Sequence, residues 1–534
     1  MSRRRPAGNG PGMQTLSAEI AIVGGGLGAC AAALAATQLG RTVALTEETR
    51  WLGGQLTNQA VPPDEHPWIE EFPPTAGYRR LREGIRDYYR AHLPLTAEAR
   101  AEPALNPGNG WVSRLCHDPR VAVAVLHQLL APHQLAGRLT VLRPHRPVEA
   151  WTDGDRITAV KVQDLETGAE QLLEARFFLD ATPYGDLLEL ANVEHVLGAE
   201  SQAETGEPHA SDVADSNDQQ AITVCFALEH LPGEDHTIDR PRQYERWRDL
   251  HPRGWPGPLL GWTTPEPETN EPLTRPLFAA KGEQSWWSFR RILDRTHFED
   301  GYARSDVTVV NWPQNDYWFG PVVGVDAEER ERNLEDARQL SLSLLHWLQT
   351  EAPRPDDGHG YPGLRLRGDV VGGTADGLAP APYVRDSRRI AAEFTVREQH
   401  IAYPLRPDGP ERFRDSVGVG CYRIDLHPRV SGSGYLDLGC WPFQIPLGAL
   451  IPIRVENLLP GGKNLGVTHI ANGAFRVHPV EWSVGEAAGT LAAFCLERRV
   501  LPRQVGSRSD LLDELQSLLR RQGVELSWPS LTPV

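Results

Sequence analysis

The chain has 534 residues, of which 40% are hydrophobic and 23% are charged, an ordinary balance for a globular protein. This length exceeds what one simple core needs, and it predicts one large two-lobed unit or several domains. The formal net charge is −17, which argues against a nucleic-acid binder and against binding to an anionic membrane surface. No stretch approaches the ~20 apolar residues of a membrane helix, so neither nucleic acid nor membrane is an expected partner.

The six cysteines are scattered and form no Cys-x-x-Cys pair, which argues against a zinc ribbon, an iron–sulfur site or a dithiol centre. The histidines and aspartates show no metal spacing, so we expect no metal. Free thiols in a reducing compartment are the simple expectation, and we predict a cytoplasmic protein. Residues 1–16 contain three successive arginines without a following apolar segment, and we expect a disordered tail there.

The first predicted elements form a βαβ unit that contains a glycine-rich turn. The apolar run 20–23 leads into this turn and an alanine-rich helix, and a second strand ends at Glu47. In such a unit Gly24 allows the tight turn, Gly26 lets a pyrophosphate approach the backbone, and Ala29 keeps helix and strand close. Glu47 follows Gly24 by 23 residues, where an acid is expected to accept hydrogen bonds from a ribose. The pattern therefore predicts a bound dinucleotide.

A second glycine cluster, Gly53-Gly54-Gln55, follows closely. Two helices are predicted next, over residues 75–91 and 118–133. A small antiparallel meander follows, with strands over 139–142, 157–162 and 171–179. The meander ends in a buried strand that carries Asp180, Ala181 and Thr182.

The middle of the chain is dense in proline, glycine and acid, and its clearest element is a helix over 326–350. Seven of the 15 tryptophans lie between Trp247 and Trp318. With Trp312 and Asn315 among them, this segment would suit a sugar-like or aromatic ligand that stacks on rings. The alternative is that the tryptophans build the core of a loop-rich domain.

Residues 422–427 alternate in polarity. Alternation places Tyr422 on one face of a strand, and Arg423 and His427 on the other. Such a strand could line a substrate pocket, or it could be a solvated edge strand with an internal ion pair.

Near the C-terminus, a strand over 457–464 runs into a glycine turn, and a small-residue helix contains Gly485. A last helix is predicted over 510–521. The segment 468–479 lies between the two cofactor elements, and we expect it to run beside the reacting part of the cofactor. There His469 and His478 could accept a proton, and Arg476 could bind an anionic group.

Three features favour FAD over NAD. The cluster at Gly53 follows Glu47 closely, the meander returns to the sheet at Asp180, and a distant C-terminal glycine turn and helix can close over the flavin side. An NAD domain would be continuous over roughly 150 residues and would not need residue 464.

These motifs resemble the FAD-dependent oxidoreductase family, on the fumarate-reductase-like branch of the glutathione-reductase-type superfamily. The resemblance implies an α/β fold with a Rossmann-like FAD domain built from both chain ends, over 17–200 and 441–500. A mixed α+β substrate domain over 201–440 and a C-terminal helix and tail over 501–534 complete the expectation. The residues expected at FAD are Gly24, Gly26, Gly28, Ala29, Glu47, Glu48, Gly53, Gly54, Gln55, Asp180, Ala181, Thr182, Gly462, Asn464 and Gly485.

The chain also departs from the family pattern. The third glycine of the first motif is Ala29, and Pro183 replaces a common glycine. Gly462-Lys463-Asn464 stands where many relatives have Gly-Asp, so Asn464 is the expected ribityl partner by position alone.

The resemblance implies an FAD-dependent oxidoreductase but does not name a substrate. We predict that it oxidises a CH–OH or CH–NH centre of a small organic molecule by hydride transfer to flavin, and the tryptophan-rich segment favours a sugar-like or aromatic substrate. Oxygen or another acceptor would take up the electrons. The chain could also form a homo-oligomer. Alternatives are a flavin-dependent reductase of an activated C=C bond and a non-catalytic FAD-containing binding protein. His66 and Cys116-His117 could attach the flavin covalently, although noncovalent FAD is the default.

Overall fold

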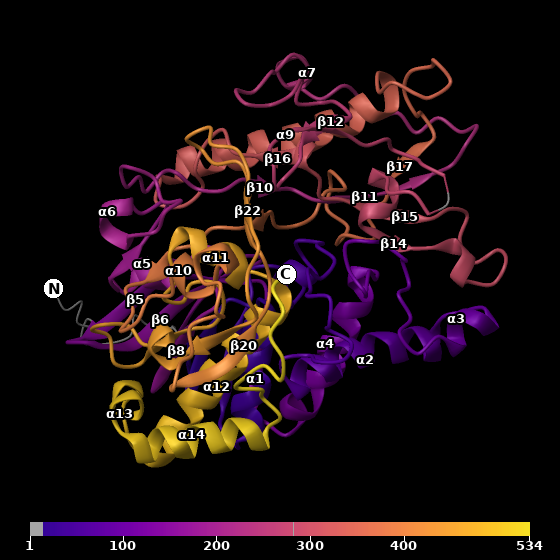
Figure 1. Cartoon of the computed structure of the whole chain (residues 1–534). Helices are drawn as coiled ribbons and strands as arrows, with labels where there is room; N and C mark the ends of the chain where they lie inside the picture. Colours follow the sequence, from indigo (N-terminus) through magenta and orange to yellow (C-terminus); the bar gives the residue numbers. More distant parts are fainter. Residues whose placement is uncertain (1–13, 281) are drawn as a thin grey trace.

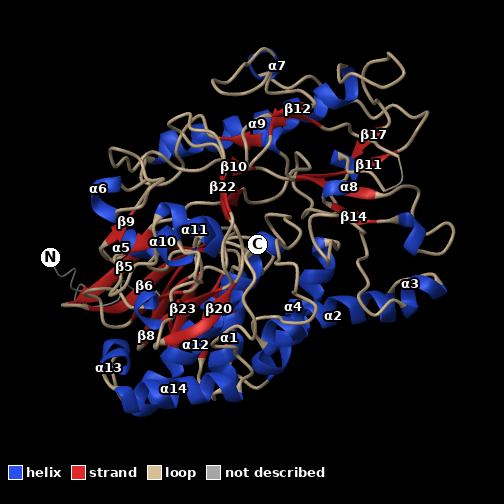
Figure 2. Ribbon diagram, in the orientation of Figure 1, coloured by secondary structure: helices blue, strands red, loops and turns tan. Residues whose placement is uncertain are grey.

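The computed structural model describes residues 14–280 and 282–534. The chain forms two lobes (Figure 1). Segments from both chain ends build the lower lobe, and the middle of the chain builds the upper lobe. Separate hydrophobic clusters fill the two lobes, and helices and strands mix in both (Figure 2). The α/β fold class is therefore confirmed, while the domain boundaries remain predictions.

A five-stranded parallel sheet forms the centre of the lower lobe. Its order is β24-β8-β2-β3-β4, with bounds β24 (Leu458–Pro460), β8 (Phe177–Asp180), β2 (Ile20–Val23), β3 (Val43–Thr46) and β4 (Leu139–Leu142). The strands β2, β3 and β8 are buried along their whole length, as expected for parallel strands covered on both faces. Because β24 pairs with β8, the sheet needs both ends of the chain.

Two helices with small residues pack closely on this sheet, α1 (Leu27–Gln38) and α12 (His478–Arg498). A Cβ atom at Gly28 would lie 2.0 Å from the carbonyl oxygen of Gly461, and one at Gly485 would lie 2.0 Å from the carbonyl oxygen of Gly28. The two helices therefore meet backbone to backbone.

A second sheet, of order β1-β7-β6-β5, forms the meander: β1 (Gln14–Ser17), β5 (His145–Asp153), β6 (Arg156–Asp164) and β7 (Glu170–Glu174). Three expectations need correction here. Residues 14–16 belong to β1 rather than to a disordered tail, whose other residues lie outside the described chain. Residues 139–142 join the parallel sheet through β3 instead of the meander. Residues 171–179 form two strands, β7 and β8, in different sheets.

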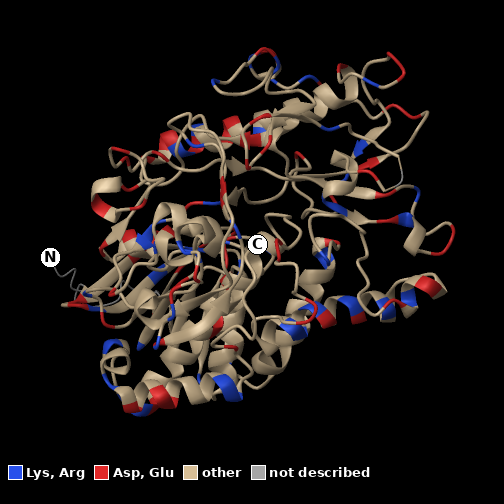
Figure 3. Ribbon diagram, viewed as in Figure 1, with Lys and Arg blue, Asp and Glu red and all other residues tan. Residues whose placement is uncertain are grey.

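Further helices surround the sheets. Three of them were predicted and are confirmed within one or two residues: α2 (Ala76–His92), α4 (Pro119–Leu135) and α14 (Ser509–Arg521). The others are α3 (Ala97–Ala101), α5 (Asp186–Leu190), α6 (Gln202–Thr205) and α13 (Pro502–Ser507). Thr75 caps α2 and Asp118 caps α4 through their side chains. Acidic and basic segments are interspersed along α2 and α14 (Figure 3).

The upper lobe surrounds the long helix α9 (Ala327–Thr350), which confirms the predicted helix over 326–350 and is capped by the side chain of Asp326. Beside it lie α7 (Tyr244–Arg248), α8 (Trp286–Phe289) and two antiparallel sheets. These contain β14 (Arg291–Leu293), β15 (Val307–Val310), β11 (Phe226–His230), β17 (Leu364–Leu366), β16 (Asp316–Tyr317), β10 (Ile222–Thr223) and β18 (Tyr383–Val384). All seven tryptophans pack in or against the core of this lobe, so they build a core, which was the second of the two interpretations.

The remaining strands form pairs: β9 (His195–Val196) with β19 (Arg389–Ile390), β12 (Thr263–Pro265) with β13 (Pro272–Thr274), β20 (Ser416–Gly420) with β23 (Phe443–Pro446), and β21 (Ile424–Leu426) with β22 (Leu436–Leu438). The segment expected to run past the reacting ring contains the helix α11 (His469–Phe475), and α10 (Glu398–Ile401) precedes it in the chain. Among the described residues, no helix has the length and apolar character needed to cross a bilayer.

Candidate functional site

A cavity of about 650 Å³ lies at the carboxyl ends of the parallel strands. Gly24 follows β2, Glu47 follows β3, Ala181 follows β8 and Gly462 follows β24, and all four line this cavity. Ligands of open α/β sheets bind at this edge. The helix α9 of the upper lobe lines the cavity through Arg330 and its neighbours.

The glycine turn has the backbone conformation that its motif predicts. Gly24 has a φ of +94°, and a Cβ atom there would lie 2.4 Å from the carbonyl oxygen of Ala181. Its N–H donates to Thr46 Oγ1 at 3.1 Å. Gly26, at the N-terminus of α1, has no side chain of its own to cap the helix. The carboxylate of Glu481 accepts from the N–H of Gly28 in the first turn at 3.3 Å, which shows that this helix start attracts an anion.

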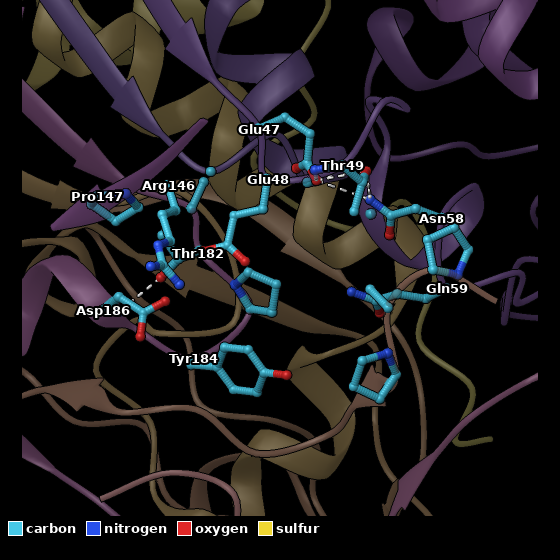
Figure 4. A pocket seen from close by; sticks show the side chains of 18 of the residues that line it. Glu47, Glu48, Thr49, Asn58, Gln59, Arg146, Pro147, Thr182, Tyr184 and Asp186 are labelled. Carbon is cyan, nitrogen blue, oxygen red and sulfur yellow. Dashed lines mark hydrogen bonds between the residues drawn. The ribbon is translucent and has the colours of Figure 1, made fainter. Parts of the chain in front are cut away.

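Glu47 lies at the end of β3, where the acid was predicted. Its carboxylate accepts hydrogen bonds from the N–H of Gly25 at 3.0 Å and of Thr49 at 2.8 Å, and from Asn58 Nδ2 at 3.1 Å. Figure 4 shows it turned toward Thr49 and Asn58. Burial raises the pKa of Glu47, and burial with the nearby Asp186 raises the pKa of Glu48 to about 7. The three hydrogen bonds to Glu47 fix the orientation of its carboxylate.

The other residues predicted at FAD fall into two groups. Glu48, Gly54, Gln55, Thr182 and Gly462 line the cavity together with those named above, whereas Gly28, Ala29, Gly53, Asp180, Asn464 and Gly485 do not.

In the second group, Asp180 and Asn464 form hydrogen bonds that hold the strand end next to the cavity. Asp180 accepts hydrogen bonds from the N–H of Thr182 at 2.9 Å and of Leu188 at 3.2 Å, and burial raises its pKa to about 7. Asn464 Nδ2 donates to the carbonyl oxygen of Asp180 at 2.9 Å. Both side chains therefore hold the end of β8.

Seven charged residues on the cavity wall escaped the sequence-based prediction: Arg146, Asp186, Glu189, Arg330, Glu331, Lys463 and Glu481. The last two lie beside the turn after β24 and at the start of α12. Lys463 donates to the carbonyl oxygen of Val384, and burial lowers its pKa to about 8 although Glu481 opposes that shift. Glu481 accepts from the N–H of Gly28 at 3.3 Å and from Gln55 Nε2, and burial raises its pKa. The Gly-Lys-Asn departure from the family pattern was the available signal, but the order of the motif favoured Asn464.

A cluster of buried polar residues surrounds Arg476 close to this end of the cavity. Arg476 donates to Tyr383 Oη at 2.7 Å and to Asp425 Oδ2 at 2.9 Å. Gln55, which lines the cavity, donates through Nε2 to the carbonyl oxygen of Arg476 at 3.1 Å. One cavity residue therefore contacts the cluster directly.

The strand β21 contributes to the same cluster. His427 Nδ1 lies 2.6 Å from Asp316 Oδ2, and Arg385 lies 3.2 Å from the other carboxylate oxygen. Burial raises the pKa of Tyr422, as do the nearby Asp64 and Asp425, which places this phenol beside the cluster.

Arg423 points elsewhere. It pairs with Asp437 and with Glu268 at 2.8 Å, so the structure brings Tyr422 and His427 together with Arg476 but leaves Arg423 outside the cluster.

The two candidate histidines have different environments. His469 Nδ1 lies 3.4 Å from Asp386 Oδ2, and neither ring nitrogen has a hydrogen-bond partner among the described residues. His478 Nδ1 accepts from the N–H of Asp64 at 3.1 Å, and Nε2 lies 3.2 Å from the carbonyl oxygen of Val61. Burial lowers the pKa of His478 to about 4. Both nitrogens of His478 therefore hold the backbone of a loop.

Neither these histidines nor Arg476, Tyr422 and His427 line the cavity, and the other candidates do not line it either. Trp312 is buried in the upper core. Asn315 Oδ1 accepts a hydrogen bond from the N–H of Trp312 at 2.9 Å, and Asn315 Nδ2 donates to the carbonyl oxygen of Val224 at 3.2 Å. The residues considered for covalent attachment are buried and do not line the cavity: His66, Cys116 and His117. Among the described residues, no group of metal-binding side chains is present.

The cavity fits a dinucleotide such as FAD. The glycine turn before α1 and the oriented acid Glu47 lie at one part of the wall, with Lys463 and Gln55 at another. Gln55 Oε1 and Asn58 Oδ1 are buried and have no hydrogen-bond partner within the described part of the chain, so both can accept hydrogen bonds from a ligand.

Comparisons with solved structures find distant likenesses to flavoenzymes and related proteins. E. coli quinol fumarate reductase FrdA is 12% identical, with a TM-score of 0.33 over 96% of this chain and 74% of that chain. A geranylgeranyl bacteriochlorophyll reductase-like protein from Thermoplasma acidophilum is 8% identical, with a TM-score of 0.36 over 96% and 85%. L-proline dehydrogenase from P. horikoshii is 16% identical, with a TM-score of 0.19 over 35% of this chain and 24% of that chain.

The chain thus spans only a quarter of that dehydrogenase, and the activities of these enzymes are their own. None of the curated proteins matches the sequence. A family model described as FAD dependent oxidoreductase matches residues 19–519, nearly the whole chain. FAD is therefore the cofactor of this protein, and the protein belongs to the FAD-dependent oxidoreductase family.

Proposed function

We propose that the protein oxidises a CH–OH or CH–NH centre of a small organic substrate beside the polar cluster around Arg476. Bound FAD supplies the hydride acceptor. The observation that carries the proposal is His469, a buried histidine whose Nδ1 lies 3.4 Å from Asp386 Oδ2 and whose Nε2 has no hydrogen-bond partner among the described residues. Such a side chain can accept the proton of a hydroxyl or ammonium group while the hydride leaves.

Asp386 would orient His469 and stabilise its protonated form. Burial alone would raise the pKa of this carboxyl, but the nearby His469 and Arg389 hold it well below its usual range. Asp386 also accepts from the N–H of Gln220 at 2.6 Å, so the carboxylate is ionised and held in place. A fixed anion favours a positive charge on the neighbouring imidazole.

Arg476 would bind an oxygen of the substrate. Its guanidinium is held by Tyr383 and Asp425, while its Nε atom is buried without a partner. A donor of this kind suits a hydroxyl or carboxylate oxygen. The preference for a sugar-like or aromatic substrate rested on tryptophans that pack in the core, so the proposal retains only the reacting centre.

An anaerobic screen of alcohols and amines, followed by the flavin absorbance, tests this function. Wild-type protein is expected to bleach with a substrate of one of these classes. His469→Gln should retain its flavin spectrum but bleach about 10²- to 10⁴-fold more slowly, the usual contribution of a general base. His251→Gln, at an exposed position, is the matched control and should bleach at the wild-type rate. Equal rates for His469→Gln and wild type would exclude His469 as the base.

The same screen addresses the reductase alternative. Arg385 and Arg476 lie close to Lys463, a concentration of cations that would suit the acidic group of an activated alkene. If wild-type flavin bleaches only with an artificial electron donor and recovers on adding such an alkene, the protein works in the reducing direction.

A further inference from the structure

Lys463 is unusual in the composition of this chain. Only three of its 54 lysine and arginine residues are lysines, namely Lys161, Lys281 and Lys463. The chain thus uses arginine almost wherever it has a basic residue, on the surface and in buried ion pairs alike. A lysine on the cofactor wall indicates a requirement that arginine does not meet. Lysine offers a compact ammonium on a flexible stem, whereas the guanidinium is a rigid planar fork.

The position of Lys463 is equally specific. It follows the glycine turn after β24 and lines the same cavity as Gly26, Gln55 and Glu481. Its Nζ atom donates to one carbonyl oxygen, that of Val384. An ammonium group has three donors, so the group can still donate to a ligand. Asn464, the residue expected from the motif order, points away from the cavity to Asp180.

No carboxylate lies within ion-pair distance of Lys463. The charged groups around it are Glu481 of α12 together with Arg476, Asp386 and Arg385. The two arginines already pair with Asp425 and Asp316, and Glu481 is engaged by Gly28 and Gln55. The ammonium therefore faces the cavity without a direct anionic partner among the described residues, which is costly unless a ligand supplies one.

We propose that Lys463 is the cation that binds an anionic oxygen of the FAD molecule, and that Glu481 is the like-charged neighbour of that oxygen. The anion is a pyrophosphate oxygen or an electron-rich oxygen of the flavin ring, which share this chemistry. The proposal depends on the cofactor and is independent of the substrate reaction proposed above. It predicts that removing the charge of Lys463 weakens FAD binding, whereas removing the charge of Glu481 on the same cavity wall strengthens it.

Binding of FAD and of ADP to the full-length protein, stripped of bound nucleotide, tests the proposal. Lys463→Met should weaken FAD binding about ten- to a hundredfold, the usual contribution of a charged hydrogen bond. Glu481→Gln keeps the shape of the side chain but removes the charge, so it should tighten binding. Lys463→Arg should bind FAD more weakly than wild type but more tightly than Lys463→Met.

The control and the choice of ligand make the result decisive. Lys161→Arg alters a lysine of β6 that pairs with Glu149 and Glu170, and it should bind FAD as wild type does. If Lys463→Met weakens ADP and FAD equally, the partner is a phosphate oxygen, and if only FAD weakens, it is on the flavin.

Unchanged FAD affinity in Lys463→Met would overturn the proposal. Equal weakening by Lys463→Met and Glu481→Gln would also overturn it, because the two residues would then only hold the cavity wall together. Thermal unfolding of each variant without nucleotide separates loss of binding from loss of folding. Because every readout is binding or unfolding, a failed substrate screen leaves this test unaffected.

Discussion

The contact between α1 and α12 has no room for a side chain, and Gly28→Ala tests this directly. A Cβ atom at residue 28 would lie 2.0 Å from the carbonyl oxygen of Gly461 and 2.8 Å from that of Glu481. The nearer distance is about 1.5 Å short of a normal contact of ~3.5 Å. Both neighbours are backbone atoms, so no change of rotamer relieves the clash, and the helix must move.

Overpacking of a well-packed core costs about 1–3 kcal/mol. Because the neighbours are rigid backbone, we expect Gly28→Ala to lower the free energy of unfolding by about 3 kcal/mol, the upper end of that range. FAD binding should weaken as well, since Gly26 and the start of α1 form the cavity wall.

The matched control is Gly257→Ala. A Cβ atom there meets nothing within 4 Å, so this variant should be neutral or more stable by up to about 1 kcal/mol. Urea unfolding followed by circular dichroism measures both variants. If Gly28→Ala is as stable as wild type, the two helices do not meet backbone to backbone and the reasoning fails.

Two further predictions concern residues that the structure places away from the cofactor cavity. Burial lowers the pKa of His478 from 6.5 to about 4, so the unfolded chain binds this proton more readily and the free energy of unfolding falls as the pH drops from about 6.5 to about 4. His478→Gln should reduce that slope by up to about 1.4 kcal/mol per pH unit, measured by urea unfolding at stepped pH; an unchanged slope would contradict the burial argument. Asn315→Ala should lower the free energy of unfolding by about 1–3 kcal/mol, because it leaves buried backbone groups without partners. The FAD dissociation constant should stay unchanged, and weaker FAD binding at full stability would instead assign Asn315 to the site.

The FAD half of the fold was predictable because its signals are local. The turn at Gly24 and the acid at Glu47 belong to one βαβ unit, where chain order determines neighbours. The helix over 326–350 was predictable for the same reason, because Asp326 caps its own helix. Such short-range patterns survive in a single sequence.

Placement by distant contacts was not predictable in the same way. The run 139–142 looks like its meander neighbours, yet it pairs with β3 because the helix α4 returns the chain to the parallel sheet. The choice between Lys463 and Asn464 depends on which of two adjacent side chains faces the cavity, and only the position of β24 decides it. His478 resembles a catalytic histidine in sequence, but its Nδ1 atom accepts a hydrogen bond from the N–H of Asp64 in a neighbouring loop.

Assembly of the sheet from both chain ends has a consequence for biosynthesis. The strand β8 ends at residue 180, but its partner β24 begins at residue 458. At about 5–20 residues per second, the ribosome needs roughly 15–60 s to add that intervening chain. During this interval the edge of β8 and the apolar side of α1 have no native cover, and FAD has no complete cavity to bind. Newly made chains should therefore depend on chaperones until the last hundred residues emerge, and cofactor uptake should follow release from the ribosome.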